Sequence, residues 1–131
     1  MDERKENMRR AVRAATEGTG ARIVERHYQQ MRLTGGFTEK TDIIAESQSY
    51  RLTVSMTSEN IKVTLLVKQG SKESLSRIAS MLEDKGLIVA DVDKDRLVAG
   101  LTTRSSRRAE DMIRGMSDVL RRVSSKGSRR R

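Results

Sequence analysis

The chain has 131 residues, with 27 Lys and Arg against 18 Asp and Glu and a formal net charge of +9. It contains no Cys, which excludes a disulfide framework, a thiol nucleophile and a metal centre built on Cys ligands. The longest apolar runs are three or four residues, too short to span a membrane, and no apolar segment follows the charged N-terminus. We therefore expect a single-domain cytoplasmic protein without a secretory signal or membrane segment.

The positive charge is concentrated towards the C-terminus. Residues 1–36 carry a net charge of +3, residues 37–103 a net charge of −1, and residues 104–131 a net charge of +7. Segregated positive charge is typical of a segment that binds a polyanion.

Helical spacing of apolar residues predicts two helices in the N-terminal part. The first helix, over 2–16, has a stripe of Met8, Ala11, Val12 and Ala15. The second helix, over 21–33, has a stripe of Ile23, Val24, Tyr28 and Met31. Gly18-Thr19-Gly20 is interpreted as a hinge between them, with Thr19 as the cap of the second helix and Gly35-Gly36 as its end.

Alternating apolar and polar residues predict strands in the middle of the chain. A short strand is expected over 41–46, followed by a hairpin of two strands over 50–56 and 61–67. Leu66 interrupts the polar face of the second hairpin strand, so we expect it to contact a helix or a partner chain.

Helical spacing returns over 72–85, where Ser71 is the expected N-cap and Gly86 ends the helix. A second hairpin, with strands over 87–92 and 97–101, follows. Because both of these strands are apolar on both faces, we expect them to lie centrally in the sheet or under a helix.

A last helix is predicted over 106–123, and residues 124–131 are expected to form a basic disordered tail. The elements together predict an α+β fold of order α(α)-β-β-β-α-β-β-α, a mostly antiparallel sheet with helices packed on it. The expected parts are a charged N-terminal helix and hinge over 1–20, an α+β domain over 21–123, and the tail.

Candidates for metal binding or catalysis are few. Asp91, Asp93 and Asp95 are spaced as in a calcium loop, but Arg96 and Thr102 stand where an EF-hand needs Gly and Glu. We therefore interpret this segment as a polar hairpin turn and expect no metal or cofactor. His27, the only histidine, has no second group for acid–base chemistry that the sequence indicates, so we expect no enzyme. An enzyme that uses Asp91, Asp93 or His27 stays a third alternative.

The basic C-terminal part supplies the predicted nucleic-acid-binding residues. They are Arg104, Arg107, Arg108, Arg114, Arg121, Arg122, Lys126, Arg129, Arg130 and Arg131. Spacing of i,i+4 predicts helix pairs for three of these arginines, Arg107 with Asp111, Arg114 with Glu110 and Arg122 with Asp118, and none for the others. Arginine suits phosphate because its planar guanidinium forms bidentate hydrogen bonds.

Aromatic residues that stack on bases are scarce, since only Tyr28, Phe37 and Tyr50 occur. We therefore expect a small basic module that binds RNA or DNA through backbone contacts, without strong sequence specificity. The segment Arg121-Arg122-Val123-Ser124 also fits an arginine-directed kinase pattern, and a phosphate there would reduce the positive charge.

A dimeric protein-binding adaptor or chaperone-like protein is the alternative. It is indicated by Leu66 and by sheet edges that the predicted elements leave free. The helix–three strands–helix order over 21–85 is similar to that of a double-stranded-RNA-binding domain. The full order is similar to that of type III secretion chaperones, and this resemblance implies a homodimer that binds an extended client.

Overall fold

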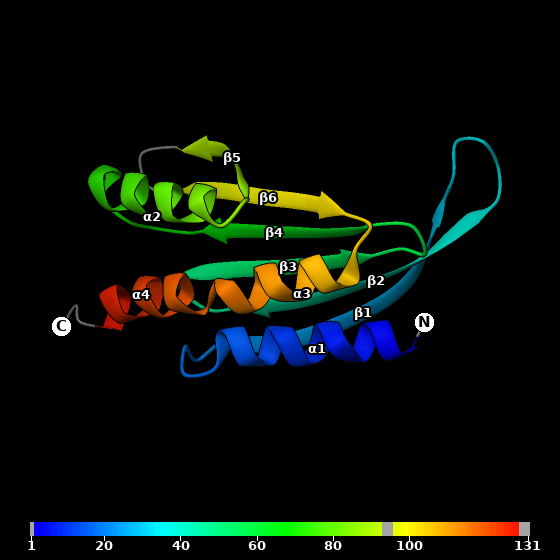
Figure 1. Cartoon of the computed structure of the whole chain (residues 1–131), viewed down its shortest axis with the longest axis horizontal. Helices are drawn as coiled ribbons and strands as arrows, with labels where there is room; N and C mark the ends of the chain where they lie inside the picture. The colour runs from blue at the N-terminus through cyan, green and yellow to red at the C-terminus, as the bar shows by residue number, and fades with distance from the viewer. Residues whose placement is uncertain (1, 93–95, 129–131) are drawn as a thin grey trace.

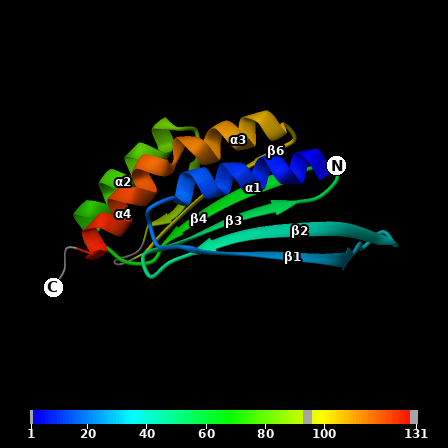
Figure 2. The same ribbon diagram turned by 90° about the horizontal axis from the view of Figure 1, so that it is seen from below.

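The strands of the described residues, 2–92 and 96–128, form one antiparallel sheet in the computed structural model (Figure 1). The strands are β1 (Arg22–Met31), β2 (Phe37–Glu46), β3 (Tyr50–Met56), β4 (Ile61–Val67), β5 (Ile88–Val92) and β6 (Leu97–Thr103). The helices are α1 (Asp2–Thr16), α2 (Lys72–Asp84), α3 (Ser106–Gly115) and α4 (Ser117–Ser128). The strand order across the sheet is β1-β2-β3-β4-β6-β5. All of these helices lie on one face of the sheet (Figure 2), so the predicted α+β fold class is confirmed.

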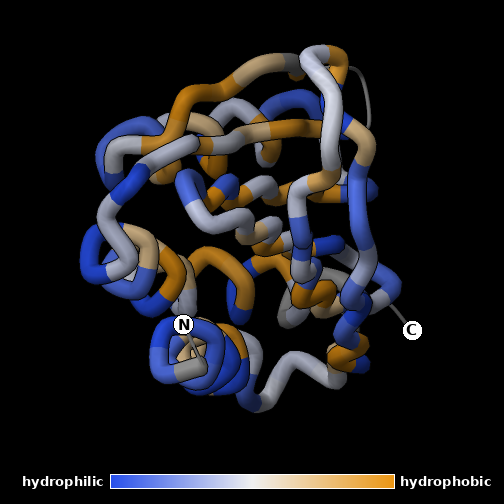
Figure 3. Tube along the Cα trace, turned by 90° about the vertical axis from the view of Figure 1, so that its right-hand side faces the viewer, coloured by the Kyte–Doolittle hydropathy of each residue, from blue (hydrophilic) through white to orange (hydrophobic). Residues whose placement is uncertain are grey.

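The hydrophobic core lies between the helices and this covered face. Alternate residues of β3 and β4 are buried against the helices: Tyr50, Leu52, Val54, Met56, Ile61, Val63, Leu65 and Val67. The predicted stripe of α1 is confirmed, because Met8, Ala11, Val12 and Ala15 are all fully buried. Near the N label in Figure 3, the turns of α1 combine hydrophilic and hydrophobic residues, as expected of an amphipathic helix.

Thr19 connects the turn after α1 to the core instead of capping a helix. Its Oγ1 donates a hydrogen bond to the carbonyl oxygen of Thr16 at 2.7 Å and lies 2.6 Å from the hydroxyl of Tyr50. Burial raises the pKa of the Tyr50 hydroxyl, which keeps that group a neutral partner. The prediction that Thr19 caps a second helix is therefore wrong.

The segment predicted as a helix over 21–33 is the strand β1. It pairs with β2 in one unbroken register from Arg22 opposite Glu46 to Met31 opposite Phe37. The turn that joins the two strands uses Gly35 and Gly36 at φ of 101° and 82°, a conformation that favours glycine. The order of elements over 21–85 is consequently four strands and a helix, which differs from that of a double-stranded-RNA-binding domain. The strand also adds one element to the order shared with type III secretion chaperones.

The strand β5 is at the edge of the sheet and packs under α2, so the expectation that the strands of the second hairpin lie centrally or under a helix is met for β5 by the helix. Its inner neighbour β6 lies between β4 and β5. Ile88 at the start of β5 has an exposed fraction of 69%, although the strand packs under α2 on its other face. The residues of β5 are therefore apolar because α2 packs against this strand, and not because the strand lies inside the sheet.

The predicted helix over 106–123 is present as α3 and α4, which are separated at Met116. Its predicted core side is confirmed, since Ala109, Met112, Ile113, Met116, Leu120 and Val123 are buried. α4 continues to Ser128, five residues beyond the predicted end at 123. Residues 129–131 of the predicted tail and residues 93–95 of the calcium-like loop lie outside the described residues.

The second face of the sheet has no helix over it in the part of the chain that the structure describes (Figure 2). We call it the open face. Leu66 lies there between Arg51 on β3 and Val98 on β6, so the expected contact of Leu66 with a helix is not made. Within the described residues, the longest apolar stretches of helix fall short of what a membrane crossing requires.

Glu46 lies at the end of β2 on the open face. Because its ion pairs form only when its carboxyl group is ionised, we expect the fold to lose stability in acid. The Glu46 carboxylate accepts hydrogen bonds from Lys68 Nζ at 2.6 Å and Arg51 Nη2 at 2.9 Å, which lower its pKa from 4.5 to about 2. A depressed carboxyl pKa stabilises the fold above 4.5, and this contribution is lost as the pH falls towards 2. The difference in unfolding free energy between the wild type and Glu46→Gln, measured in urea, should therefore shrink over this interval. A difference independent of pH would contradict this prediction.

Candidate nucleic-acid interface

The helix pair α3–α4 holds five of the predicted basic residues on its outer side, Arg107, Arg108, Arg114, Arg121 and Arg122. Ser105 begins α3 as its N-cap, and its side-chain oxygen accepts a hydrogen bond from the Arg108 backbone N–H at 3.1 Å. The buried stripe fixes the rotation of both helices against the sheet. Because a helix has 3.6 residues per turn, residues out of register with this stripe face away from the core.

The structure exposes all of the predicted arginines that it describes. Arg104 lies between β6 and α3, Arg107, Arg108 and Arg114 lie on α3, and Arg121 and Arg122 lie on α4. We call these six residues the arginine row. The Lys126 backbone belongs to α4 but its side chain lies outside the described part, as do Arg129, Arg130 and Arg131.

The arginine row is a line and not a compact cluster. Arg107, Arg114 and Arg121 follow one another at intervals of seven residues, so they lie on the same side of the helix pair, about 10 Å apart along its axis. α3 and α4 follow each other end to end in Figure 2, and Arg108 lines a pocket together with Lys85 at the end of α2. A row of this kind matches an extended polyanion better than a small anion.

The i,i+4 pairs predicted within this segment are not formed. Among the described residues, no salt bridge joins Arg107 to Asp111, Arg114 to Glu110 or Arg122 to Asp118. Asp118 instead contacts Lys85 Nζ at 3.4 Å, which ties α4 to the end of α2. The arginine row therefore retains its full hydrogen-bonding capacity, although acidic residues alternate with it along the helices.

The neighbouring helix α1 contributes fewer free cations. Arg9 is engaged with Glu25 on β1, with Nε to Oε2 at 2.7 Å and Nη2 to Oε1 at 2.8 Å, and this contact lowers the pKa of the Glu25 carboxyl. Arg10 contacts Glu6 at 3.3 Å. α1 runs beside α3 and α4 in Figure 1, so the exposed Arg13 extends the basic helical surface.

The sequence interpretation missed a second set of basic residues, which lies on the open face. The strand register places Arg22 and Arg26 of β1, Lys40 of β2, Arg51 of β3 and Lys62 of β4 on that face. Of these, Arg51 is paired with Glu46. Because residues 21–33 were interpreted as a helix, Arg22 and Arg26 were not expected to lie on a sheet beside Lys40, Arg51 and Lys62. The glycines at 35 and 36 between two segments with β-branched and aromatic residues were the available signal for a hairpin.

His27 has partners that the sequence did not indicate. Its Nε2 lies 3.1 Å from Glu25 Oε1, and its Nδ1 lies 3.1 Å from Thr41 Oγ1. The structure thus places next to His27 a carboxylate and a hydroxyl for which the sequence offered no evidence. Glu25 is also held by Arg9, so the arrangement ties α1, β1 and β2 together at the edge of the sheet.

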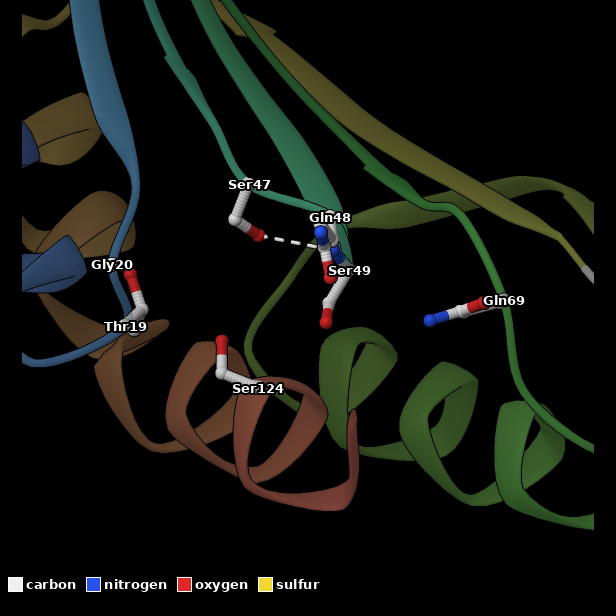
Figure 4. A pocket seen from close by; sticks show the side chains of 7 residues that line it. All are labelled: Thr19, Gly20, Ser47, Gln48, Ser49, Gln69 and Ser124. Atoms are coloured by element: carbon white, nitrogen blue, oxygen red, sulfur yellow. Dashed lines mark hydrogen bonds between the residues drawn. The ribbon is translucent and has the colours of Figure 1, made fainter. Parts of the chain in front are cut away.

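A polar pocket of about 370 Å³ lies where α4 approaches the β2–β3 turn (Figure 4). It is lined by Thr19, Gly20, Ser47, Gln48, Ser49, Gln69 and Ser124, none of which is charged. The hydroxyl of Ser124 is buried and has no hydrogen-bond partner in the described part of the chain. A kinase that reads Arg121-Arg122-Val123-Ser124 would not reach this buried hydroxyl while α4 is folded.

No known family model matches this chain, and neither the curated proteins nor the solved structures contain a significant match to it. The structure defines an α+β domain with helices on one face of a six-stranded sheet and a row of exposed arginines on those helices.

Proposed function

We propose that this is a cytoplasmic, non-enzymatic module that binds RNA or DNA mainly through the phosphate backbone. The observation that carries the proposal is the arginine row, whose six members are exposed and have no salt bridge in the described part of the chain. An unpaired guanidinium presents its N–H donors to phosphate without first breaking a protein contact.

Contact with the backbone, and not with bases, fits the distribution of aromatic residues. Tyr50 is buried in the core, and Tyr28 and Phe37 lie on β1 and β2, away from α3 and α4. The helix pair therefore offers cations but no ring on which a base would stack. Phosphate contacts of this kind position a protein on nucleic acid without reading its sequence.

A salt series tests the proposal. Affinity for labelled duplex DNA and RNA, measured by fluorescence anisotropy from about 50 to about 200 mM salt, should fall steeply because phosphate contacts release counterions. Replacing Lys126, Arg129, Arg130 and Arg131 together by glutamine should flatten the slope, and a scrambled oligonucleotide should bind equally well. Binding that is insensitive to salt and to this variant would overturn the proposal.

A dimeric protein-binding adaptor is the second candidate, and the concentration of exposed apolar side chains favours it. Six of the eight large hydrophobic residues that are exposed lie between residues 23 and 37 of the described chain. Exposed apolar patches on a small domain mark surfaces for other chains.

A further inference from the structure

The strand β1 is an uncovered edge of the sheet. Nine of its ten residues are exposed, and only Glu25 is partly buried. α1 packs against β2 and α3, and reaches β1 through the Arg9–Glu25 ion pair. The open face of β1 is consequently uncovered in the described part of the chain, and on its other face the described contact with α1 is the Arg9–Glu25 ion pair.

The two edges of the sheet differ in the features that prevent pairing with another strand. β5 has five residues, an irregularity in its register between Val89 and Asp91, and α2 packed against it. Short length, bulges and a covering helix are the usual protection of an edge strand. β1 has ten residues in an unbroken register and contains no proline. It therefore offers a regular template for an added strand.

The pairing of β1 with β2 determines which backbone groups of β1 point outwards. The Arg32 backbone N–H donates to the Gly36 carbonyl at 3.0 Å, and hydrogen-bonded pairs alternate along an antiparallel ladder. Even-numbered residues of β1 therefore bond to β2, and odd-numbered residues direct their N–H and C=O groups outwards. These outward residues are Ile23, Glu25, His27, Gln29 and Met31.

We propose that β1 pairs with β1 of a second copy of this chain, antiparallel about a two-fold axis at Arg26. This register places Val24 opposite Tyr28 of the second copy on the open face, a pairing of β-branched and aromatic side chains that stabilises sheets. On the other face it places Glu25, which Arg9 holds in each copy, opposite His27 and not opposite a second carboxylate. Each contact occurs twice, so the interface closes on itself and gives a dimer and not a filament.

Neighbouring registers are less complementary. An axis one residue earlier places Glu25 opposite Glu25, and an axis one residue later places Arg22 opposite Arg32. The proposed axis places Arg26 opposite Arg26, but each of these arginines also lies beside Asp42 of its own β2. The Asp42 carboxylate is buried, and its Oδ1 has no hydrogen-bond partner in the described residues, so a negative charge is available next to the axis.

The oligomeric mass and a single-cysteine scan test this proposal. Light scattering should give the wild-type chain a mass of twice 14.8 kDa. Because the chain has no Cys, Arg26→Cys introduces one thiol per copy. At the axis of a non-hydrogen-bonded pair the two Cα atoms are about 4.5 Å apart, within disulfide range. Mild oxidation should therefore convert most of this variant to a covalent dimer.

The matched control is Gln30→Cys, an exposed position on the same face of β1. The two thiols would lie about 27 Å apart in the proposed register, so this variant should form no disulfide dimer. Gln29→Pro removes an outward N–H while leaving the ladder to β2 intact, and should yield a monomer with unchanged circular dichroism.

Three outcomes would overturn the inference: a monomeric wild type, equal cross-linking at positions 26 and 30, or a dimer that survives Gln29→Pro. This dimer rests on the second candidate function, the dimeric adaptor, and β1 would be its interface. The outcome of the dimer tests is independent of nucleic-acid binding, which the anisotropy measurement reports separately.

Discussion

Replacing Arg107, Arg114 and Arg121 together by glutamine should weaken nucleic-acid binding by about two to three orders of magnitude near 0.1 M salt. The basis is counterion release, which changes log K by about 0.9 per phosphate contact for each tenfold change in salt. The three arginines share one side of α3–α4 and have no salt bridge in the described residues, so each can reach a separate phosphate. The salt slope should fall by about 2.7 if all three make contact.

A matched variant separates the position of the charges from their number. Replacing Arg22, Lys40 and Lys62 by glutamine removes the same net charge from the open face. Affinity and salt slope, measured by anisotropy on one duplex, should change much less than in the α3–α4 variant. Equal losses would mean that binding follows net charge alone, and a larger loss in the open-face variant would assign the interface to that face.

Replacing Leu65 by alanine should lower the free energy of unfolding by about 2–5 kcal/mol. Leu65 is fully buried in β4, opposite Leu52 on β3 and Ala99 on β6, in the middle of the covered face. Truncation there removes apolar contact area and leaves a cavity that the flanking strands cannot close. A loss of this size is a large fraction of the stability of a small domain.

The adjacent residue Leu66 is the control, because it has the same side chain in the same strand but lies on the open face. Leu66→Ala should cost less than Leu65→Ala, since Leu66 is only partly buried and lies on a face that no helix covers in the described residues. Urea unfolding of both variants checks the comparison. Similar losses would show that Leu66 is buried in solution, for instance by a partner chain on the open face.

Local patterns predicted the parts of the fold that bury one side against the core. The alternation in β3 and β4 and the stripes of α1, α2 and α3–α4 each record which side chains face inwards. The same logic predicted that the arginines from 104 to 122 face outwards, and the structure exposes them. The three expected i,i+4 pairs are not formed among the described residues, and in one of them Asp118 contacts Lys85 at the end of another helix in place of Arg122.

The largest error falls on the edge strand β1, which was predicted as a helix. β1 buries neither face, so its side chains carry no period-two pattern, and Ile23, Val24, Tyr28 and Met31 equally fit helical spacing. β5 is apolar because α2 packs on it, and an apolar run is the same for a central strand and a covered edge strand. The basic open face was missed for the same reason, since its composition emerges only when β1 is placed beside β2.

The amino-acid sequence by itself determined the fold class, the inward-facing residues of the helices and central strands, and the basic character of the C-terminal part. These properties are local, because each is encoded in the periodicity of one segment. Tertiary structure alone decided the order of the strands, the exposure of β1 and the separation of two basic faces. These depend on pairing between backbones, which hydrogen-bond in the same way whatever side chains they carry.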